Sequence, residues 1–173
     1  MTVTPDLHTP SPADLDARLR ALRDTQEVVD ALYRFAAGQD RKDTALFLSA
    51  FAPDATLDFT QPARRFGREV PVMDHDAIAG IPDTLAPLAT THTVTNPRVT
   101  LDGDRATLTA LVEAQHVVAA APERHLLLKN DYDVDLVRDD SAHGDGPWRV
   151  ARMVIRTVWH DGDPAVLFGE ARP

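Results

Sequence analysis

Apolar residues recur at helical spacing along the first part of the chain. They stand three or four positions apart over residues 15–36, a period typical of an amphipathic helix. A helix-start signature precedes them, namely a capping hydroxyl, a proline at the first helical position and an acid in the first turn, at Ser11, Pro12 and Asp14. The pattern predicts a long helix up to Gly38, either continuous or broken near Asp24 and Thr25. Residues 1–11, rich in Pro, Ser and Thr, are expected to form a disordered tail.

Shorter elements are expected between this helix and residue 90. Asp43 can cap a second helix that continues to Phe51, and Pro53 then directs the chain into a strand at 55–59. Residues 60–73 have the composition of a loop. A further helix, kinked by a proline, is expected after Asp74, with apolar positions at Ile78, Ile81, Leu85 and Leu88 and the proline at Pro82.

From about residue 90 the pattern changes to strict alternation of apolar and polar residues. It predicts four long strands, at about 91–101, 105–119, 124–138 and 147–160. The Asp-Gly pair within residues 101–105 is a strong hairpin signal between the first two. Helices followed by an antiparallel meander predict an α+β fold, with the helices packed on one face of a curved sheet. No internal repeat or second domain is visible, so residues 12–173 are expected to form a single domain.

Polar side chains interrupt the apolar face of this predicted sheet. His116 falls in the apolar row of its strand, Asn130 and Tyr132 fall in that of the next, and His92 lies on one face of the first strand. Burying such groups without partners costs ~1–3 kcal/mol each, so they must pair with one another, with water or with a ligand. A lone inward histidine is more often a satisfied core residue, but four polar groups on adjacent strands favour a pocket.

Alternation also sorts the last strand into two faces. Its more apolar row is expected to face the core, at Ala151, Met153, Ile155 and Trp159. The basic residues of the other row are expected in solvent or at a subunit contact, at Arg152, Arg156 and His160. Trp148, like Trp159, is expected in the core or in an interface.

Composition excludes several classes of function. The net charge of −9 and the pI near 5.1 argue against a nucleic-acid surface, which needs a clustered basic face. The absence of cysteine rules out disulfides, zinc thiolate sites and thiol nucleophiles. No stretch approaches the ~18 apolar residues of a membrane span, and the N-terminus lacks a basic region followed by an apolar run. We therefore expect a cytoplasmic protein that binds neither membrane nor nucleic acid.

The order of elements and several local words resemble the SnoaL-like group of the nuclear transport factor two-like superfamily. The matching words are LYRFAAGQDRKDTALFLSAFAPDATLDF at 32–59, TTHTVTNPRV at 90–99, YDVDLVR at 132–138 and WRVARMVIRTVWHDG at 148–162. The resemblance covers nearly the whole chain after the tail. It implies a cone-shaped α+β barrel, and it leaves the substrate open because this fold carries many chemistries.

Dehydratase and dehydrochlorinase members of this group use a helix-borne aspartate that orients a strand-borne histidine as general base. By resemblance these roles fall on Asp40 and His92. The same comparison assigns further pocket positions to His116, Asn130, Tyr132, Tyr33, Phe59 and Met153. The chain departs from the pattern where tyrosines of the dehydratase are replaced by Gln39 and Phe59, and where cationic residues of the dehydrochlorinase fall on Phe35 and Met153.

These residues predict a lyase or isomerase that needs no metal or organic cofactor and acts on an apolar, oxygenated small molecule such as a polyketide, terpenoid or steroid-like ring. Cyclase or epoxide hydrolase chemistry would use the same groups. The alternative from another class is a non-catalytic binding or assembly module, in which Asp40 and His92 would not be in contact. The resemblance also implies a homodimer or homotrimer, assembled through the sheet.

Overall fold

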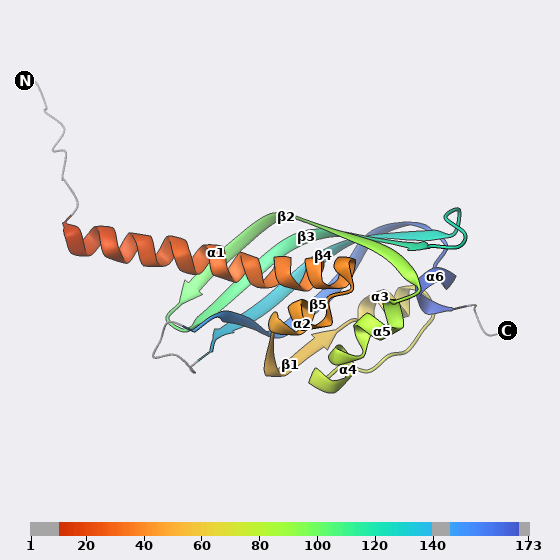
Figure 1. Cartoon of the computed structure of the whole chain (residues 1–173), viewed down its shortest axis with the longest axis horizontal. Helices are drawn as coiled ribbons and strands as arrows, with labels where there is room; N and C mark the ends of the chain where they lie inside the picture. Colours follow the sequence, from red (N-terminus) through yellow and green to blue (C-terminus); the bar gives the residue numbers. More distant parts are fainter. Residues whose placement is uncertain (1–10, 140–145, 170–173) are drawn as a thin grey trace, which may run out of the picture.

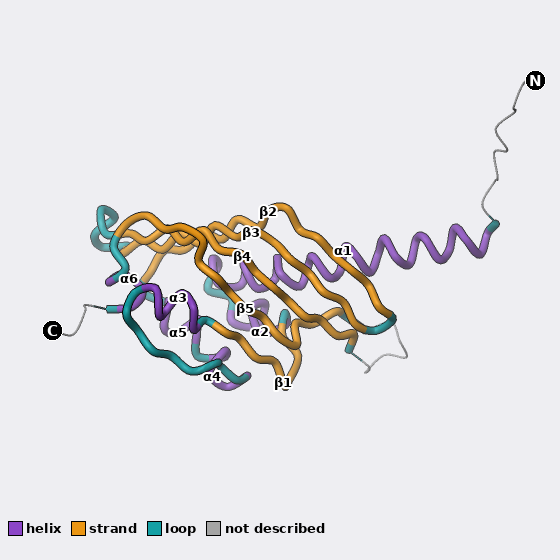
Figure 2. The backbone as a smooth tube through the Cα atoms, turned by 180° about the vertical axis from the view of Figure 1, so that it is seen from behind, coloured by secondary structure: helices purple, strands orange, loops and turns teal. Residues whose placement is uncertain are grey.

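The computed structural model describes residues 11–139 and 146–169. Helices come first and a curved sheet of five strands follows, in the α+β arrangement expected from the sequence (Figure 1). Figures 1 and 2 show the long N-terminal helix lying across one face of the sheet, while the short helices that follow residue 59 gather at one end. The space between that end and the concave face of the sheet holds the site described below.

Helix α1, Pro12–Arg41, is continuous, so the break considered near Asp24 is wrong. Ser11 and Asp14 form the expected capping box, and Lys42 ends the helix in the left-handed conformation. Gly38 does not end the helix. It lies against the next helix, and a Cβ at this position would clash with the backbone nitrogen of Phe47. This glycine therefore permits a close helix–helix approach rather than a turn.

The second helix and the first strand divide differently from the prediction. Asp43 caps α2, Thr44–Ser49, by accepting the backbone N–H of Leu46 at 2.9 Å. Strand β1, Phe51–Asp58, then begins at Phe51, so Pro53 lies inside the strand instead of preceding it. The proline is tolerated there because β1 is an edge strand of the sheet.

Two further corrections concern the segment before the long strands. Residues 60–73, expected as loop, contain helix α3, Thr60–Arg65. Asp74 caps a helix as expected, but the helix ends at Gly80 and a new one follows. Pro82 stands in the first turn of the second helix, where it is favoured, so it starts a helix rather than kinking one. The bounds of the pair are His75–Ala79 for α4 and Ile81–Leu85 for α5.

The four long strands are confirmed, and together with β1 they form one sheet in the order β1-β5-β4-β3-β2. Neighbours among them are antiparallel, whereas β1 is parallel to β5. Their bounds are Leu88–Asp102 for β2, Arg105–Val118 for β3, His125–Arg138 for β4 and Trp148–Gly162 for β5. A last short helix, α6, Ala165–Phe168, packs against β3 and β4. The main core lies between α1 and the sheet.

Strand β5 departs from strict alternation because two irregularities interrupt its pairing with β4. After Thr157, which faces inward, the second irregularity turns Trp159 to the outer face, where it lies opposite Lys129 and is half exposed. The expectation that Trp159 faces the core is therefore wrong, while Trp148 is fully buried. His160, expected on the outer side, packs edge-on against Phe66.

Arg152 and Arg156 of β5 lie on the outer face as expected. Arg152 and Arg156 form exposed ion pairs with Asp135 and Asp133 of the neighbouring strand. Such pairs contribute little to stability, and they leave the inner face of the sheet to apolar and neutral polar groups.

Candidate active site

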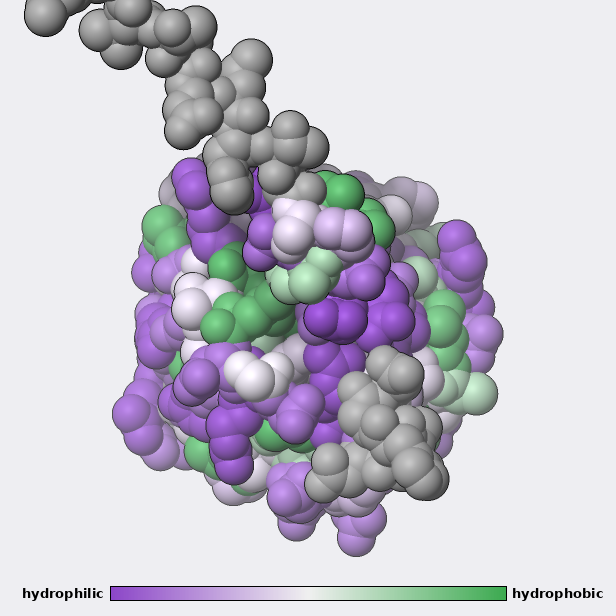
Figure 3. Space-filling model, turned by 90° about the vertical axis from the view of Figure 1, so that its left-hand side faces the viewer, coloured by the Kyte–Doolittle hydropathy of each residue, from purple (hydrophilic) through white to green (hydrophobic). Residues whose placement is uncertain are grey.

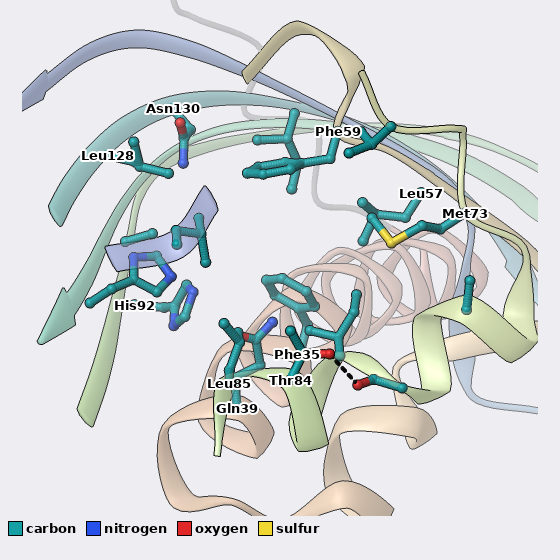
Figure 4. A pocket seen from close by; sticks show the side chains of 18 of the residues that line it. Phe35, Gln39, Leu57, Phe59, Met73, Thr84, Leu85, His92, Leu128 and Asn130 are labelled. Atoms are coloured by element: carbon teal, nitrogen blue, oxygen red, sulfur yellow. Dashed lines mark hydrogen bonds between the residues drawn. The ribbon is translucent and has the colours of Figure 1, made fainter. Parts of the chain in front are cut away.

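A cavity of about 330 Å³ lies between the concave face of the sheet, the end of α1 and the short helices. Its volume falls within the range typical of small-molecule sites. Figure 4 shows its wall, with His92 and Asn130 on the strand side and Leu57, Phe59 and Met73 across the cavity. The lining is mostly apolar, and its few polar groups come from α1, α5 and strands β2, β3 and β4.

Asp40 and His92 are in contact at this cavity. Asp40 stands in the last turn of α1, and its carboxylate reaches strand β2. Its Oδ2 accepts the backbone N–H of His92 at 2.7 Å, and its Oδ1 lies 2.7 Å from Nδ1 of the same residue. The two bonds fix both the strand and the imidazole ring relative to the helix end.

The charge on Asp40 determines which nitrogen of His92 carries the proton. Burial favours the neutral acid, but the hydrogen bonds and charge of His92 outweigh it, so the pKa of Asp40 is lowered below its ordinary value. An ionised carboxylate can only accept hydrogen bonds. Nδ1 of His92 must therefore be the donor, and Nε2 of the neutral ring keeps its lone pair. This is the tautomer that a general base requires.

His116 packs beside this pair. The His92 and His116 rings meet edge to face with centroids 5.9 Å apart, and His116 is only 4% exposed. Burial, and then the neighbouring His92, lower the pKa of His116 to about 4 from an ordinary value of 6.5. The ring is therefore neutral at neutral pH. Its Nδ1 is buried without a partner among the described residues.

Asn130 is held by a residue that the sequence interpretation did not single out. The hydroxyl of Thr157 donates to Oδ1 of Asn130 at 2.8 Å, deep in the sheet. This bond fixes the orientation of the amide and leaves its NH₂ group facing the neighbouring Tyr132. Thr157 stands in the same row of β5 as Met153 and Ile155, so alternation alone could have identified it.

Tyr132 supplies a phenol at the cavity wall. Burial raises its pKa, and the side-chain hydrogen bond from Asn130 opposes this only in part. The phenol therefore stays protonated and can donate a hydrogen bond.

Gln39 is a second polar residue that the sequence interpretation left without a role. It is 6% exposed, lines the cavity next to Asp40 on α1, and its Oε1 has no partner in the described part of the chain (Figure 4). Its sequence signal was the resemblance, in which a tyrosine of the dehydratase stands at this position directly before Asp40. The apolar cover from α5 and α6, including Leu85 and Phe168, had no signal beyond hydrophobicity.

Not every predicted pocket residue lies at the cavity. Phe59, His92, His116, Asn130 and Tyr132 line the cavity. Asp40 is not part of the lining but hydrogen-bonds His92, which is. Tyr33 is 42% exposed on α1, because its position in the helical turn faces away from the sheet. Met153 is fully buried in the main core. Neither residue lines the cavity.

The described residues hold neither a metal-binding cluster nor a membrane-spanning helix. Within residues 11–139 and 146–169, no three His, Asp or Glu side chains lie close enough together to hold a metal ion. Within the same residues, no helix has the length and apolar character to cross a membrane. The tail expected at residues 1–11 lies outside the described residues, apart from Ser11.

Fold and site together define an α+β barrel protein with a small-molecule cavity and a buried carboxylate–imidazole pair. The chain belongs to the SnoaL-like family, since the family model for the SnoaL-like domain matches residues 20–154. This confirms the resemblance drawn from the sequence, and the fold is that of the nuclear transport factor two-like proteins.

Individual relatives agree with this membership. The chain is 34% identical over 154 residues to "Terrestric acid biosynthesis cluster protein E" of Penicillium crustosum, covering 85% of this chain and 91% of that protein. A crystal structure of a protein from Kribbella flavida is 27% identical with a TM-score of 0.69, over 82% of this chain and 95% of that one. A putative scytalone dehydratase from Novosphingobium aromaticivorans, 16% identical, has a TM-score of 0.68 over 86% and 91% of the two chains. This last similarity concerns the fold.

Proposed function

We propose that the protein is a cofactor-independent lyase or isomerase of the dehydratase type. It removes a carbon-bound proton from a small, mostly apolar, oxygenated molecule, such as a polyketide, terpenoid or steroid-like ring. The observation that carries this proposal is the double contact between Asp40 and His92 at the cavity. A non-catalytic binding module of the same fold would not need this contact.

In the proposed reaction His92 is the base and Asp40 is the residue that positions it. Nε2 of His92 takes the proton from the carbon next to a carbonyl, and the C–H electrons form the new double bond. In a dehydration the C–O bond to the β-hydroxyl breaks, and the protonated imidazole returns its proton to the leaving oxygen as water forms. In an isomerisation the proton returns to another carbon instead.

The oxygen that gains charge during this step needs donors. Tyr132 supports such a role because its phenol is buried and protonated, and a hydrogen bond given to a developing oxyanion is worth more in a water-poor cavity. Asn130, oriented by Thr157, lies beside it. His116 is neutral and can act either as donor or as acceptor, according to its tautomer.

Ring closure of a polyketide and epoxide hydrolysis are second candidates, because the same acid–base groups would serve them. The relative from a biosynthesis cluster of Penicillium crustosum supports a biosynthetic intermediate as the substrate of either reaction. Product analysis separates these reactions from elimination, since cyclisation and isomerisation keep the mass of the substrate, dehydration lowers it by one water and epoxide hydrolysis raises it by one.

The test is turnover of a panel of β-hydroxy carbonyl and unsaturated ring compounds. His92→Ala should lower kcat/KM by about 10²–10⁴, the usual contribution of a general base. Asp40→Asn should lower kcat by at least ~100-fold with a smaller change in KM, because the amide cannot hold the same tautomer as firmly. Tyr33→Phe, on the same helix but outside the cavity, is the matched control. Undiminished turnover in His92→Ala would refute the proposal.

A further inference from the structure

The first part of α1 projects beyond the rest of the molecule. Residues 11–23 are exposed, and the first buried residue of the helix is Val28. Figure 1 shows this end of α1 extending past the edge of the sheet. At 1.5 Å per residue, residues 12–23 extend about 18 Å. A lone helical segment of this length is marginal in water, yet its end carries the complete capping box of Ser11 and Asp14.

An apolar stripe follows this projecting segment. Leu15, Leu19 and Leu22 are 48%, 63% and 67% exposed, and their spacing of four and three residues places them in one row. Gln26 takes the next position of this row, and Val29 follows where the helix meets the body of the protein. Figure 3, which faces the end where α1 projects, shows apolar residues exposed between hydrophilic ones. Three leucines in register on an uncovered helix are typical of a helix–helix contact.

The charges beside the stripe select the orientation of a partner helix. In heptad terms Leu15 and Leu22 are at d and Leu19 is at a, which places Asp16 and Arg23 at e. In an antiparallel pair of identical helices, Leu19 of one copy packs against Leu22 of the other. The e positions then face each other, so Asp16 of each copy meets Arg23 of the other, twice by symmetry. In a parallel pair, Arg18 at g would instead face Arg23 of the second copy, which is repulsive.

We propose that two copies of this chain associate through the projecting parts of α1, packed antiparallel around Leu19. The occupant of the stripe is thus a second copy of the same chain, because the helix is complementary to itself in charge as well as in its apolar row. Asp40 stands 21 residues further along α1 than Leu19, about 30 Å away, so each copy keeps its own cavity. The proposal does not depend on the reaction proposed above.

The first experiment compares self-association of the full chain and two variants by sedimentation equilibrium over a wide range of concentration. Leu19→Asp places a charge in the stripe and should raise the dimer dissociation constant at least ~30-fold. Ala21→Asp places the same charge in the same turn on the opposite side of the helix, and it should change the constant less than twofold. Circular dichroism and turnover of each variant report on the fold and the cavity, which both should retain.

Two results would overturn the proposal. One is a wild-type chain that stays monomeric at every concentration. The other is a dimer that Leu19→Asp leaves intact, as expected if the copies met through the outer face of the sheet around Leu111 and Trp159, whose side chains are also exposed.

Charge reversal then tests the orientation. Asp16→Arg and Arg23→Asp should each weaken the homodimer at low salt, because each creates two like-charge contacts. An equimolar mixture of the two variants should form a heterodimer as tight as the wild-type dimer, since every Arg then faces an Asp. A mixture that associates no better than the separate variants would exclude the antiparallel arrangement.

Discussion

Thr157→Val removes one hydroxyl and almost no volume, so it isolates the bond that holds Asn130. Both residues are buried in the sheet, and the Thr157 hydroxyl donates to Oδ1 of Asn130 at 2.8 Å. Without it the Asn130 oxygen stays buried with no donor, which costs ~1–3 kcal/mol. We therefore expect the free energy of unfolding to fall by about 2 kcal/mol, with little contribution from repacking. The backbone bonds of Thr157 to Gln61 do not involve the hydroxyl and should persist.

Urea denaturation measures this change, with the m-value as a check that the unfolded state is unaffected. The double variant Thr157→Val, Asn130→Leu should be less destabilised than the sum of the single variants, because it removes the Thr157 donor and the Asn130 acceptor together. Where turnover is measurable, Thr157→Val should lower kcat more than it raises KM, since Asn130 positions Tyr132. A loss below ~0.5 kcal/mol in Thr157→Val would refute the reasoning.

Further predictions concern pH and packing. The pKa of His116 falls from 6.5 to about 4 on folding. The neutral ring therefore contributes up to about 3 kcal/mol to the free energy of unfolding, in full above pH 6.5, and this contribution is lost as the pH falls from 6.5 to 4. Urea titrations of His116→Gln should show a shallower loss of stability across that pH range. The pKa of Asp40 is also lowered, so Asp40→Asn should be less stable than wild type at pH 7, and the two stabilities should converge as the pH falls below the ordinary carboxyl pKa. Gly38→Ala, usually stabilising in a helix by ~0.5–1 kcal/mol, should here cost more than ~1 kcal/mol in thermal unfolding because of the contact with Phe47; an increase in Tm would contradict this.

Periodicity predicted the parts of the fold in which one face is buried along a whole element. The rows around His116 and Asn130 were identified correctly because β3 and β4 alternate without interruption between core and solvent. The same rule failed at Trp159, because an irregularity in the pairing of β5 reverses the faces and leaves no mark in the sequence. Gly38 was misinterpreted for a related reason, since a glycine needed for close packing looks the same as one that ends a helix.

The sequence predicted the site residues that have distinctive chemistry. It did not predict which other positions of a helix or strand reach the cavity. The resemblance placed Asp40 and His92 in contact, and the structure has that contact. It also placed Tyr33 and Met153 at the pocket, but Tyr33 lies about two helical turns before Asp40, beyond the cavity, and Met153 lies in the main core. The helical covers α4, α5 and α6 are too short to show a period, so their part in closing the cavity follows only from the fold.

The distribution of polarity inside the cavity limits the orientation of any ligand. Gln39, His92 and Asn130 lie toward the strand side and the end of α1, whereas Leu57 and Met73 lie across the cavity from them (Figure 4). An apolar ring would lose favourable burial if it were turned toward the polar wall, and its oxygen atoms would lose their hydrogen bonds at the apolar wall. Both effects favour the same pose, with oxygenated carbons against His92. In the proposed reaction a base held in one tautomer is useful only against a substrate held in one orientation, and this cavity would supply both constraints from residues that are otherwise unrelated in sequence.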